Sequence, residues 1–250
     1  MQSISIIGDG GWGTTLAVHL ARSKHHVKLW GPFPAYVRKV SKDRYNTKFL
    51  PGIHLSRNIQ LTESLTEAVA ESSLIVFAVP SKYASEILKK IKKTRVDLAN
   101  RIFLSVTKGI DTVKFLRMSE IIKKELGPIP LAVLSGPTIA IEVARGIPST
   151  AVVASHNIQI AKKIQKIFNS QSFRIYTNTD VVGVELGGSI KNIIAIACGV
   201  CDGLGFGSNT KAAILTRGLT EMARLGKALG AKQKTFAGLA GLGDLVTTCI

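Results

Sequence analysis

The sequence has few cysteines, few acidic residues and no long apolar segment. The cysteines, Cys198, Cys201 and Cys249, are too few and odd in number for the disulfide framework of a secreted protein. The longest apolar stretches, at residues 74–79 and 193–200, are shorter than the ~20 residues that cross a bilayer. No basic segment precedes the first apolar run, as it would in a signal peptide. We therefore expect a cytoplasmic protein with no membrane span.

Acidic residues number only 16 against 33 Lys and Arg, so the formal net charge is +17 at pH 7. This excess favours an anionic partner: nucleic acid, an anionic membrane surface, or a small phosphorylated substrate with a phosphate-bearing cofactor. The basic residues form short clusters, at 89–95, 123–124 and 162–166, with apolar residues at helical spacing between them. That arrangement is typical of solvated helix faces, so nucleic acid is not the partner we expect.

The 250 residues, 46% of them hydrophobic, are enough for one or two folded domains. β-Branched or continuously apolar runs predict strands at residues 3–7, 27–30, 74–79, 102–106, 131–134, 149–155 and 173–176. Helical patterns lie between several of them, as at 14–22 and 157–169, which predicts a doubly wound α/β sheet, parallel and covered by helices on both faces. Beyond Tyr176 the pattern is helical, at 180–200 and 211–229, so we place a domain boundary there.

A glycine-rich segment follows the first predicted strand and precedes the first predicted helix. Gly8-Asp9-Gly10-Gly11-Trp12-Gly13 fits the pattern G-x-G-x-x-G. In that pattern the first glycine permits a tight turn, the second lets the backbone approach a pyrophosphate, and the third allows close packing of strand and helix. The helix N-terminus then holds the anion. An ordinary glycine turn is the alternative, but the position between strand and helix favours a dinucleotide cofactor.

The acid that binds the ribose of NAD is missing from its usual place. It would stand about 20 residues beyond the glycines, at the end of the second strand. Trp30-Gly31-Pro32-Phe33 occupies that stretch, and the next acid is Asp43. Arg38 and Lys39 could attract the 2′-phosphate of NADP, although a solvated helix face is the favoured explanation for them. Both NAD and NADP therefore stay open.

Two further predicted strands end in polar loops, where an open sheet meets its ligands. Lys108 follows the strand at 102–106 and suits an anion or a polar carbonyl, with a solvated loop lysine as the alternative. Gly136-Pro137-Thr138 follows the strand at 131–134 and offers backbone N–H groups and a hydroxyl to a phosphate or to the nicotinamide amide.

Lys191 is a lone charge in an otherwise apolar helix. Burial would lower its pKa from about 10.4 and fit it for proton exchange near neutral pH, whereas a snorkelling lysine at the helix edge is the simpler alternative. Gly187 and Gly188, one turn earlier, favour room for a ligand. Asp244, in a glycine-rich loop, either pairs with this lysine or caps a turn or helix.

The remaining candidates for metal chemistry are weak. Cys198 and Cys201 fit C-x-x-C inside an apolar helix without a second ligand pair, which favours packing over zinc or redox chemistry. The five histidines have no metal-ligand spacing. We therefore expect no metal site.

Together these segments resemble the NAD(P)-dependent glycerol-3-phosphate dehydrogenase family over essentially the whole chain. The resemblance is carried by residues 8–17, 79–81, 107–109, 135–138, 185–192, 209–218 and 238–249. It implies an NAD(P)-binding Rossmann domain at residues 1–176 and an α-helical substrate and catalytic domain, truncated, at residues 177–250. It also implies a cytoplasmic enzyme that supplies sn-glycerol 3-phosphate for phospholipid synthesis, and it allows for a homodimer.

The resemblance further implies a role for each matching residue. Lys191 would be the general acid in reduction of dihydroxyacetone phosphate and the general base in oxidation, Lys108 would polarise the substrate, and Asp244 would hold Lys191. The implied substrate contacts are Lys108, Gly136, Thr138, Lys191, Asn192, Asp244 and Thr248. The implied contacts with the cofactor, NAD or NADP, are Gly8, Gly10, Gly11, Trp12, Gly13, Lys108, Gly136 and Ala140.

One element of the family is not found. An Arg-Asn pair that grips the substrate phosphate would follow shortly after Thr247-Thr248-Cys249, and this sequence stops at Ile250, so we expect a fragment or a truncated gene product. Two alternatives follow. One is a related β-hydroxyacid-type dehydrogenase, acting on 3-hydroxyacyl-CoA or 6-phosphogluconate. The other is a nonenzymatic protein that binds nucleotides or, given the charge of +17, nucleic acid.

Overall fold

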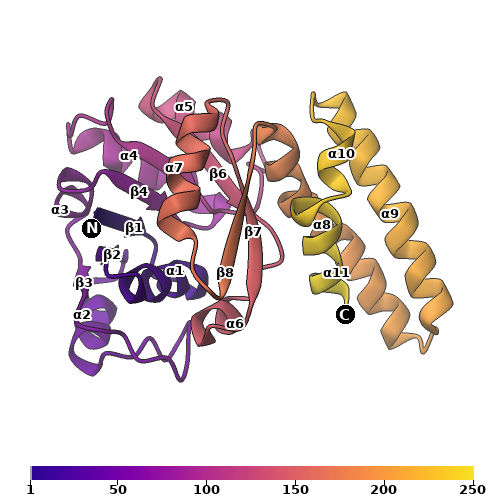
Figure 1. Cartoon of the computed structure of the whole chain (residues 1–250), viewed down its shortest axis with the longest axis horizontal. Helices are drawn as coiled ribbons and strands as arrows, with labels where there is room; N and C mark the ends of the chain where they lie inside the picture. The colour runs from indigo at the N-terminus through magenta and orange to yellow at the C-terminus, as the bar shows by residue number, and fades with distance from the viewer. Residues whose placement is uncertain (1) are drawn as a thin grey trace.

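The computed structural model describes residues 2–250, and its centre is an eight-stranded sheet of order β3-β2-β1-β4-β5-β6-β7-β8 (Figure 1). The strands are β1 (Ser3–Ile7), β2 (His26–Trp30), β3 (Ile59–Thr62), β4 (Leu74–Phe77), β5 (Ile102–Ser105), β6 (Leu131–Ser135), β7 (Ser149–Ala154) and β8 (Phe173–Asn178). Neighbouring strands from β3 to β6 run parallel, as predicted. In such a sheet the loops that follow the strands meet at one edge.

The prediction of an all-parallel sheet is wrong at one junction. Strand β7 pairs with β6 in the antiparallel sense, and β8 then runs parallel to β7. The short helix α6 (Ala140–Arg145) between β6 and β7 packs beside α1 (Gly11–Arg22) instead of crossing a face of the sheet. The chain therefore enters β7 from the edge at which β6 ended.

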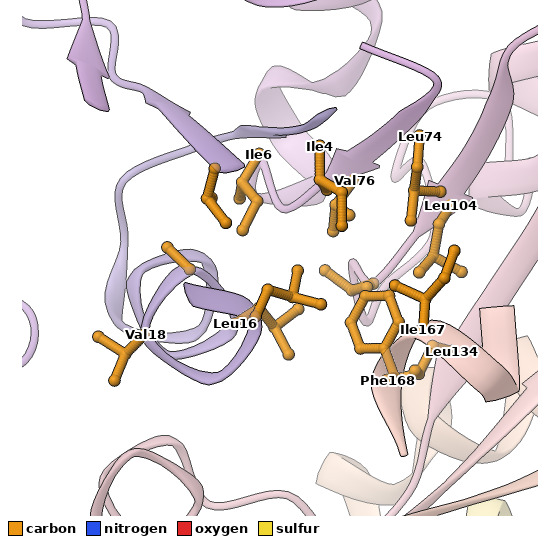
Figure 2. Close-up of a cluster of buried hydrophobic side chains, with 14 of the residues drawn as sticks. Ile4, Ile6, Leu16, Val18, Leu74, Val76, Leu104, Leu134, Ile167 and Phe168 are labelled. Carbon is orange, nitrogen blue, oxygen red and sulfur yellow. The ribbon is translucent and has the colours of Figure 1, made fainter. Parts of the chain in front are cut away.

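Helices cover both faces of the sheet, and side chains alternate between them. Ile4 and Ile6 of β1 pack with α1 and α7 (Ile158–Phe168), the cluster drawn in Figure 2. Ile7 belongs to a second cluster on the other face. The helices of that face are α3 (Leu65–Ala70), α4 (Ala84–Lys93) and α5 (Met118–Leu126), while α2 (Pro34–Asp43) packs beside β3. A 3₁₀ turn, η1 (Ser81–Tyr83), leads into α4.

The chain after Asn178 is helical and lies at the end of the molecule away from the N-terminus (Figure 1). Its elements are α8 (Val181–Gly203), α9 (Ser208–Ala228), α10 (Gln233–Phe236), the π-helical turn η2 (Leu239–Gly243) and α11 (Asp244–Cys249). Asp180 starts α8 by accepting a hydrogen bond from the Gly183 N–H at 2.9 Å. Helix α8 contacts β6 and β7 on one side and α9, α10 and α11 on the other.

Helix α8 is long and apolar enough, by length and composition, to cross a membrane. The apolar stretch at 193–200 is by itself too short to predict such a helix. The small and polar residues that precede it in α8 supply the remaining length. Half of the most apolar window is buried inside the protein, and the helix carries the buried charged residues Glu185 and Lys191. Its first half therefore has the properties of a core helix, whereas Ile193, Ile196 and Val200 in its second half are exposed.

Candidate functional site

The glycine loop between β1 and α1 has room for a ligand only where its second glycine stands. Gly8 has φ of +119°, a conformation that a residue with a side chain rarely adopts, and a β-carbon there would lie 2.7 Å from the Ala78 carbonyl oxygen. A β-carbon at Gly13 would lie 2.0 Å from the Gly8 carbonyl oxygen. A β-carbon at Gly10 would meet no atom within 4 Å, and within residues 2–250 no side chain caps α1. This cradle fits a diphosphate at the helix N-terminus.

A cavity of about 850 Å³ opens in front of this loop. It is bounded by the glycine loop, by the end of β2 and by the ends of β4 and β5. Strand order places the loop after β2 on one side of β1 and the loops after β4 and β5 on the other. Beyond the glycines, the cavity is lined by Asp9, Trp12, Trp30, Pro32, Phe33, Phe49, Ala78, Val79, Pro80, Tyr83, Glu86, Ile87, Lys90, Val106, Thr107, Lys108 and Thr138.

Asp9, within the glycine loop, is a buried acid in this cavity that the sequence analysis did not single out. Its side chain is on the cavity wall, and one carboxylate oxygen is buried without a hydrogen-bond partner. Burial raises the pKa of Asp9, while its own backbone N–H and the charge of Lys48 act to lower that pKa. The signal was available: an acid stands between two glycines in a sequence that has no acid at the end of β2.

Three charged residues from distant parts of the chain meet beside the cavity. The Lys108 Nζ lies 2.6 Å from Asp244 Oδ2, and the Lys191 Nζ lies 3.4 Å from Asp244 Oδ1. Lys108 follows β5, Lys191 lies in α8, and Asp244 begins α11. Lys191 and Asp244 are 7% and 2% exposed, so the carboxylate joins a buried lysine to Lys108, which is partly exposed. Two ammonium groups against one carboxylate leave the cluster with excess positive charge.

Lys108 connects this cluster to the cavity. It lines the cavity, and besides its ion pair with Asp244 its Nζ donates a hydrogen bond of 3.0 Å to the Gly136 carbonyl oxygen. Burial lowers the pKa of the Lys108 amine; the charge and hydrogen bond of Asp244 oppose that shift, and the charge of Lys191 adds to it. A cation held here faces the place where an anion or a polarised carbonyl oxygen would bind.

Of the other predicted substrate residues in the described part of the chain, Thr138 and Thr248 contact the cavity or the charged cluster, whereas Asn192 does not. The Thr138 hydroxyl donates to the Gly136 carbonyl oxygen at 3.1 Å, and Thr138 lines the cavity. The Thr248 hydroxyl accepts a hydrogen bond from the Lys191 Nζ and donates one of 2.7 Å to the Asp244 carbonyl oxygen. Asn192 is exposed on α8, and within residues 2–250 no hydrogen bond joins its side chain to the cluster.

The other predicted cofactor residues lie around the start of α1. The Ala140 carbonyl oxygen accepts a 3.0 Å hydrogen bond from the Thr15 hydroxyl of α1. Gly136 has φ of +145° in the loop after β6. The indole of Trp12 packs edge-on against Phe173, with 6.5 Å between ring centroids. A β-carbon at Gly11 would lie 2.7 Å from the Phe49 carbonyl oxygen, so this glycine permits close packing of the loop after α2.

The two glycines before Lys191 do not leave space for a ligand, and that expectation is wrong. A β-carbon at Gly187 would lie 2.2 Å from the Ala240 carbonyl oxygen. A β-carbon at Gly188 would lie 2.4 Å from the Ser135 hydroxyl and 3.4 Å from Cγ of Lys108. Glycine is therefore required because α8 packs directly against the turn η2 and the Lys108 side chain, and this approach brings the three charges together.

Glu185 is a second buried acid that sequence reasoning did not identify as part of the site's support. It accepts hydrogen bonds from Arg117 at 2.7 Å and from the Ser119 N–H and hydroxyl at 2.7 and 2.6 Å. Burial raises the pKa of Glu185, while Ser119 and Arg117 act to lower it. These contacts fix α8 to the start of α5. Nothing in the sequence near Glu185 points to Arg117, because the two are brought together only by the fold.

The structure offers no evident metal centre in the part of the chain it describes, residues 2–250, where no group of three or more His, Cys, Asp or Glu side chains is placed to hold an ion. The thiols of Cys198, Cys201 and Cys249 are free and buried. Burial, together with its contact to Cys198, raises the pKa of the Cys249 thiol to about 11. The Cys249 thiol therefore stays protonated at neutral pH. All three buried cysteines act as packing groups.

A sheet of this order, a glycine cradle at its first crossover and lysines beside the cavity define a dinucleotide-dependent oxidoreductase. Two family models match the chain: the NAD-dependent glycerol-3-phosphate dehydrogenase N-terminus at residues 3–161 and the C-terminus of the same family at residues 180–250. The chain belongs to the NAD-dependent glycerol-3-phosphate dehydrogenase family.

Relatives and solved structures agree with the family models. The chain is 48% identical to glycerol-3-phosphate dehydrogenase [NAD(P)+] of Thermoanaerobacter sp. (strain X514), over 99% of this chain and 74% of that protein. The enzyme structure from Coxiella burnetii superposes with a TM-score of 0.95 at 41% identity, covering 100% of this chain and 76% of that one. The structure from yeast, Saccharomyces cerevisiae, gives a TM-score of 0.86 at 30% identity, over 99% and 77%.

Proposed function

We propose that this chain interconverts dihydroxyacetone phosphate and sn-glycerol 3-phosphate with NAD or NADP as cofactor. The observation that carries the proposal is the bridge that Asp244 forms between Lys191 and Lys108, because Lys108 also lines the cavity in front of the glycine cradle. Family membership favours this reaction over that of a β-hydroxyacid-type dehydrogenase and over a nonenzymatic role.

The residues that would hold the cofactor are those of the cradle and of the loop after β6. Gly8, Gly10, Gly11, Trp12 and Gly13 would surround the diphosphate, and Gly136, Ala140 and Lys108 would lie toward the nicotinamide end. The cradle fits this group because its second glycine is open while the first and third are closely packed. When bound, the reduced cofactor supplies the hydride for the substrate carbon C2.

The proton chemistry belongs to the lysines. During reduction the carbonyl oxygen on C2 gains negative charge, and we assign Lys191 as the general acid that donates a proton to that oxygen. In oxidation the neutral Lys191 amine takes the proton back from the hydroxyl. Lys108 would polarise the same oxygen, since a cation already in place stabilises developing negative charge without reorganisation. Asp244 would hold both amines in position.

The remaining substrate contacts are polar groups around this oxygen and the phosphate. We assign Thr138 and Gly136 from the cavity side, and Thr248 from the side of Lys191. Asn192 would join them once substrate is bound, since its exposed amide follows Lys191 on α8.

We also propose the cellular setting and organisation that the resemblance implied. The product sn-glycerol 3-phosphate would serve phospholipid synthesis, the enzyme would be cytoplasmic, and the chain would form a homodimer. Residues 1–176 and 177–250 would be its two domains, which is supported by the end of β8 at Asn178 and the start of α8 at Val181.

The test follows oxidation of NADH or NADPH by dihydroxyacetone phosphate, with Lys191→Ala as the variant. Loss of a general acid is expected to reduce kcat by about 10²–10⁴-fold while cofactor binding persists. Lys124→Ala is the matched control, because Lys124 is exposed on α5. Turnover that survives Lys191→Ala would contradict the assigned role. Turnover of 3-hydroxyacyl-CoA or 6-phosphogluconate, with none of dihydroxyacetone phosphate, would select the other dehydrogenase class.

A further inference from the structure

The cavity contains an acid at the adenosine end that does not come from the usual strand. In α/β sheets of this kind the ribose hydroxyls of NAD are bound by an acid at the end of the second strand. Here β2 ends at Trp30 and is followed by Gly31 and Pro32, so that position has no side chain. Asp9, at the end of the neighbouring strand β1, lines the same cavity and is 6% exposed.

The carboxylate of Asp9 fills the space that a side chain at position 31 would need. A β-carbon on Gly31 would lie 2.2 Å from Asp9 Oδ2 and 2.5 Å from Asp9 Cγ. Any larger residue at position 31 would therefore collide with Asp9. The two positions are complementary: the end of β2 has no acid, and the carboxylate of Asp9 in the glycine loop occupies that space.

The neighbours of Asp9 fix its backbone and leave one of its carboxylate oxygens without a partner. The Asp9 carbonyl oxygen accepts hydrogen bonds from Asn46 Nδ2 at 2.8 Å and from the Thr14 hydroxyl at 3.1 Å. Asn46 is fully buried and is itself fixed by the Tyr36 hydroxyl at 2.7 Å. None of these donors reaches the side chain, and among the described residues, 2–250, the buried Asp9 Oδ2 has no hydrogen-bond partner. A buried acceptor without a donor raises the free energy of the unliganded protein. A hydrogen bond from a ligand hydroxyl to this oxygen would therefore favour binding.

We propose that Asp9 accepts hydrogen bonds from the adenosine ribose hydroxyls and thereby makes this chain prefer NAD over NADP; the proposal rests on the proposed function. A carboxylate has two oxygens, which suits a vicinal diol. The 2′-phosphate of NADP would bring negative charge against the same group, and like charges at close range repel.

Arg38 and Lys48 do not form an arginine fork for a 2′-phosphate. The Arg38 guanidinium is paired with Glu63 at 2.7 Å, and Glu63 follows β3 at this edge of the sheet. Lys48 is close enough to Asp9 to act on its pKa, and its Nζ lies 5.0 Å from the centre of the Phe49 ring. One lysine beside a carboxylate neutralises it in part and does not give the arginine fork that a 2′-phosphate favours.

The experiment measures equilibrium binding of NADH and of NADPH by cofactor fluorescence, in the absence of substrate. The unmodified chain is expected to bind NADH at least about tenfold more tightly than NADPH. Asp9→Asn keeps the shape and removes the charge, so it should weaken NADH binding and bring the ratio of the two dissociation constants close to one, a change of about tenfold. Asp43→Asn, an exposed acid on α2, is the matched control and should change neither constant.

A second variant moves the acid to its usual place. Asp9→Ala combined with Gly31→Asp puts a carboxylate at the end of β2. Removal of the Asp9 carboxylate relieves the contacts at 2.2 and 2.5 Å, and the Val37 side chain, whose Cγ2 would lie 2.9 Å from the new β-carbon, must shift slightly. Preference for NADH should return relative to Asp9→Ala alone. Asp9→Ser, checked by circular dichroism, provides an independent loss of the acid if Asp9→Asn does not fold.

The possible outcomes distinguish a failure of this inference from a failure of the proposed function. If the ratio of the dissociation constants for NADH and NADPH is the same in the unmodified chain and in the folded Asp9→Asn and Asp9→Ser variants, the role of Asp9 alone is overturned. Tighter binding of NADPH than of NADH by the unmodified chain would overturn it as well. Failure of the folded, unmodified chain to bind either cofactor would overturn both this inference and the proposed function.

Discussion

The two parts of the site are built in opposite ways. The glycine cradle is local: Gly8, Gly10 and Gly13 lie in one short loop, and their effect depends on backbone conformation and on missing β-carbons. The charged cluster is nonlocal: Lys108, Lys191 and Asp244 come from three separate elements, and their effect depends on side-chain charge.

This difference determines how each part can fail. A cradle that depends on close packing is disrupted when a β-carbon is added, because the strand and helix around it must then move apart. A cluster of buried charges fails when one partner is removed, since the remaining charges then lack compensation. The following three changes separate these modes, beginning with the largest expected effect.

Asp244→Ala should be the most damaging single substitution in the cluster. It leaves two lysine amines side by side, of which Lys191 is 7% exposed, without the carboxylate that bridges them. Breaking a buried ion pair from one side costs about 3–5 kcal/mol. The pKa of Lys108, already lowered by burial, should fall further once Asp244 no longer raises it. We expect a lower free energy of unfolding in urea and loss of turnover.

An exposed ion pair provides the control for this prediction. Lys211 Nζ lies 2.8 Å from Asp202 Oδ2, and the Asp202 side chain is 56% exposed. Asp202→Ala should change the free energy of unfolding by less than about 1 kcal/mol, because water already solvates both charges. Equal losses from Asp244→Ala and Asp202→Ala would show that burial does not set the strength of the cluster.

Gly13→Ala and Gly10→Ala should separate folding from binding within the cradle. The added carbon at position 13 would meet the Gly8 carbonyl oxygen at 2.0 Å, so β1 and α1 must move apart. We expect a lower melting temperature together with at least tenfold weaker NADH binding. At position 10 the carbon meets no atom within 4 Å, so Gly10→Ala should keep its melting temperature and weaken NADH binding alone. Equal melting temperatures for the two variants would contradict the packing argument.

Much of the sheet could be predicted because buried parallel strands are continuous apolar runs. The predicted strand at 3–7 has the bounds of β1, and the predicted strand at 173–176 extends only slightly further, to Asn178. Strand β3 was missed because Ile59–Thr62 is short and alternates apolar and polar residues within a polar stretch. The direction of β7 could not be derived, since it depends on where α6 packs.

The site was predictable where one segment carries the signal. The glycine pattern located the cradle, and a lone charge in an apolar helix located Lys191, which is indeed buried. The contact of Asp244 with Lys108, and the anchoring of Glu185 by Arg117, depend on tertiary packing and have no local signal. The two glycines before Lys191 were misinterpreted for the same reason: the sequence shows that side chains are absent there but not which atoms fill the space.

The prediction with the smallest expected effect concerns His19. This residue makes a nonlocal contact that involves no charged partner and lies outside the cavity. Its Nε2 hydrogen-bonds the Phe168 carbonyl oxygen at 2.7 Å, which ties α1, the helix that follows the cradle, to the end of α7. Burial lowers the pKa of His19 below 6.5, so the native state binds fewer protons than the unfolded state as pH falls below that value. Stability therefore decreases with acidification in this window.

His19→Gln keeps a donor for Phe168 but cannot be protonated in this range. In urea titrations at several pH values from neutral downward, the unmodified chain should lose stability more steeply than the variant once the pH falls below 6.5. NADH binding near neutral pH should be the same in both, because His19 does not line the cavity. Parallel pH profiles would mean that His19 is protonated equally in the folded and unfolded chains, and a change in NADH binding would mean that the cradle depends on α7 as well as on its own glycines.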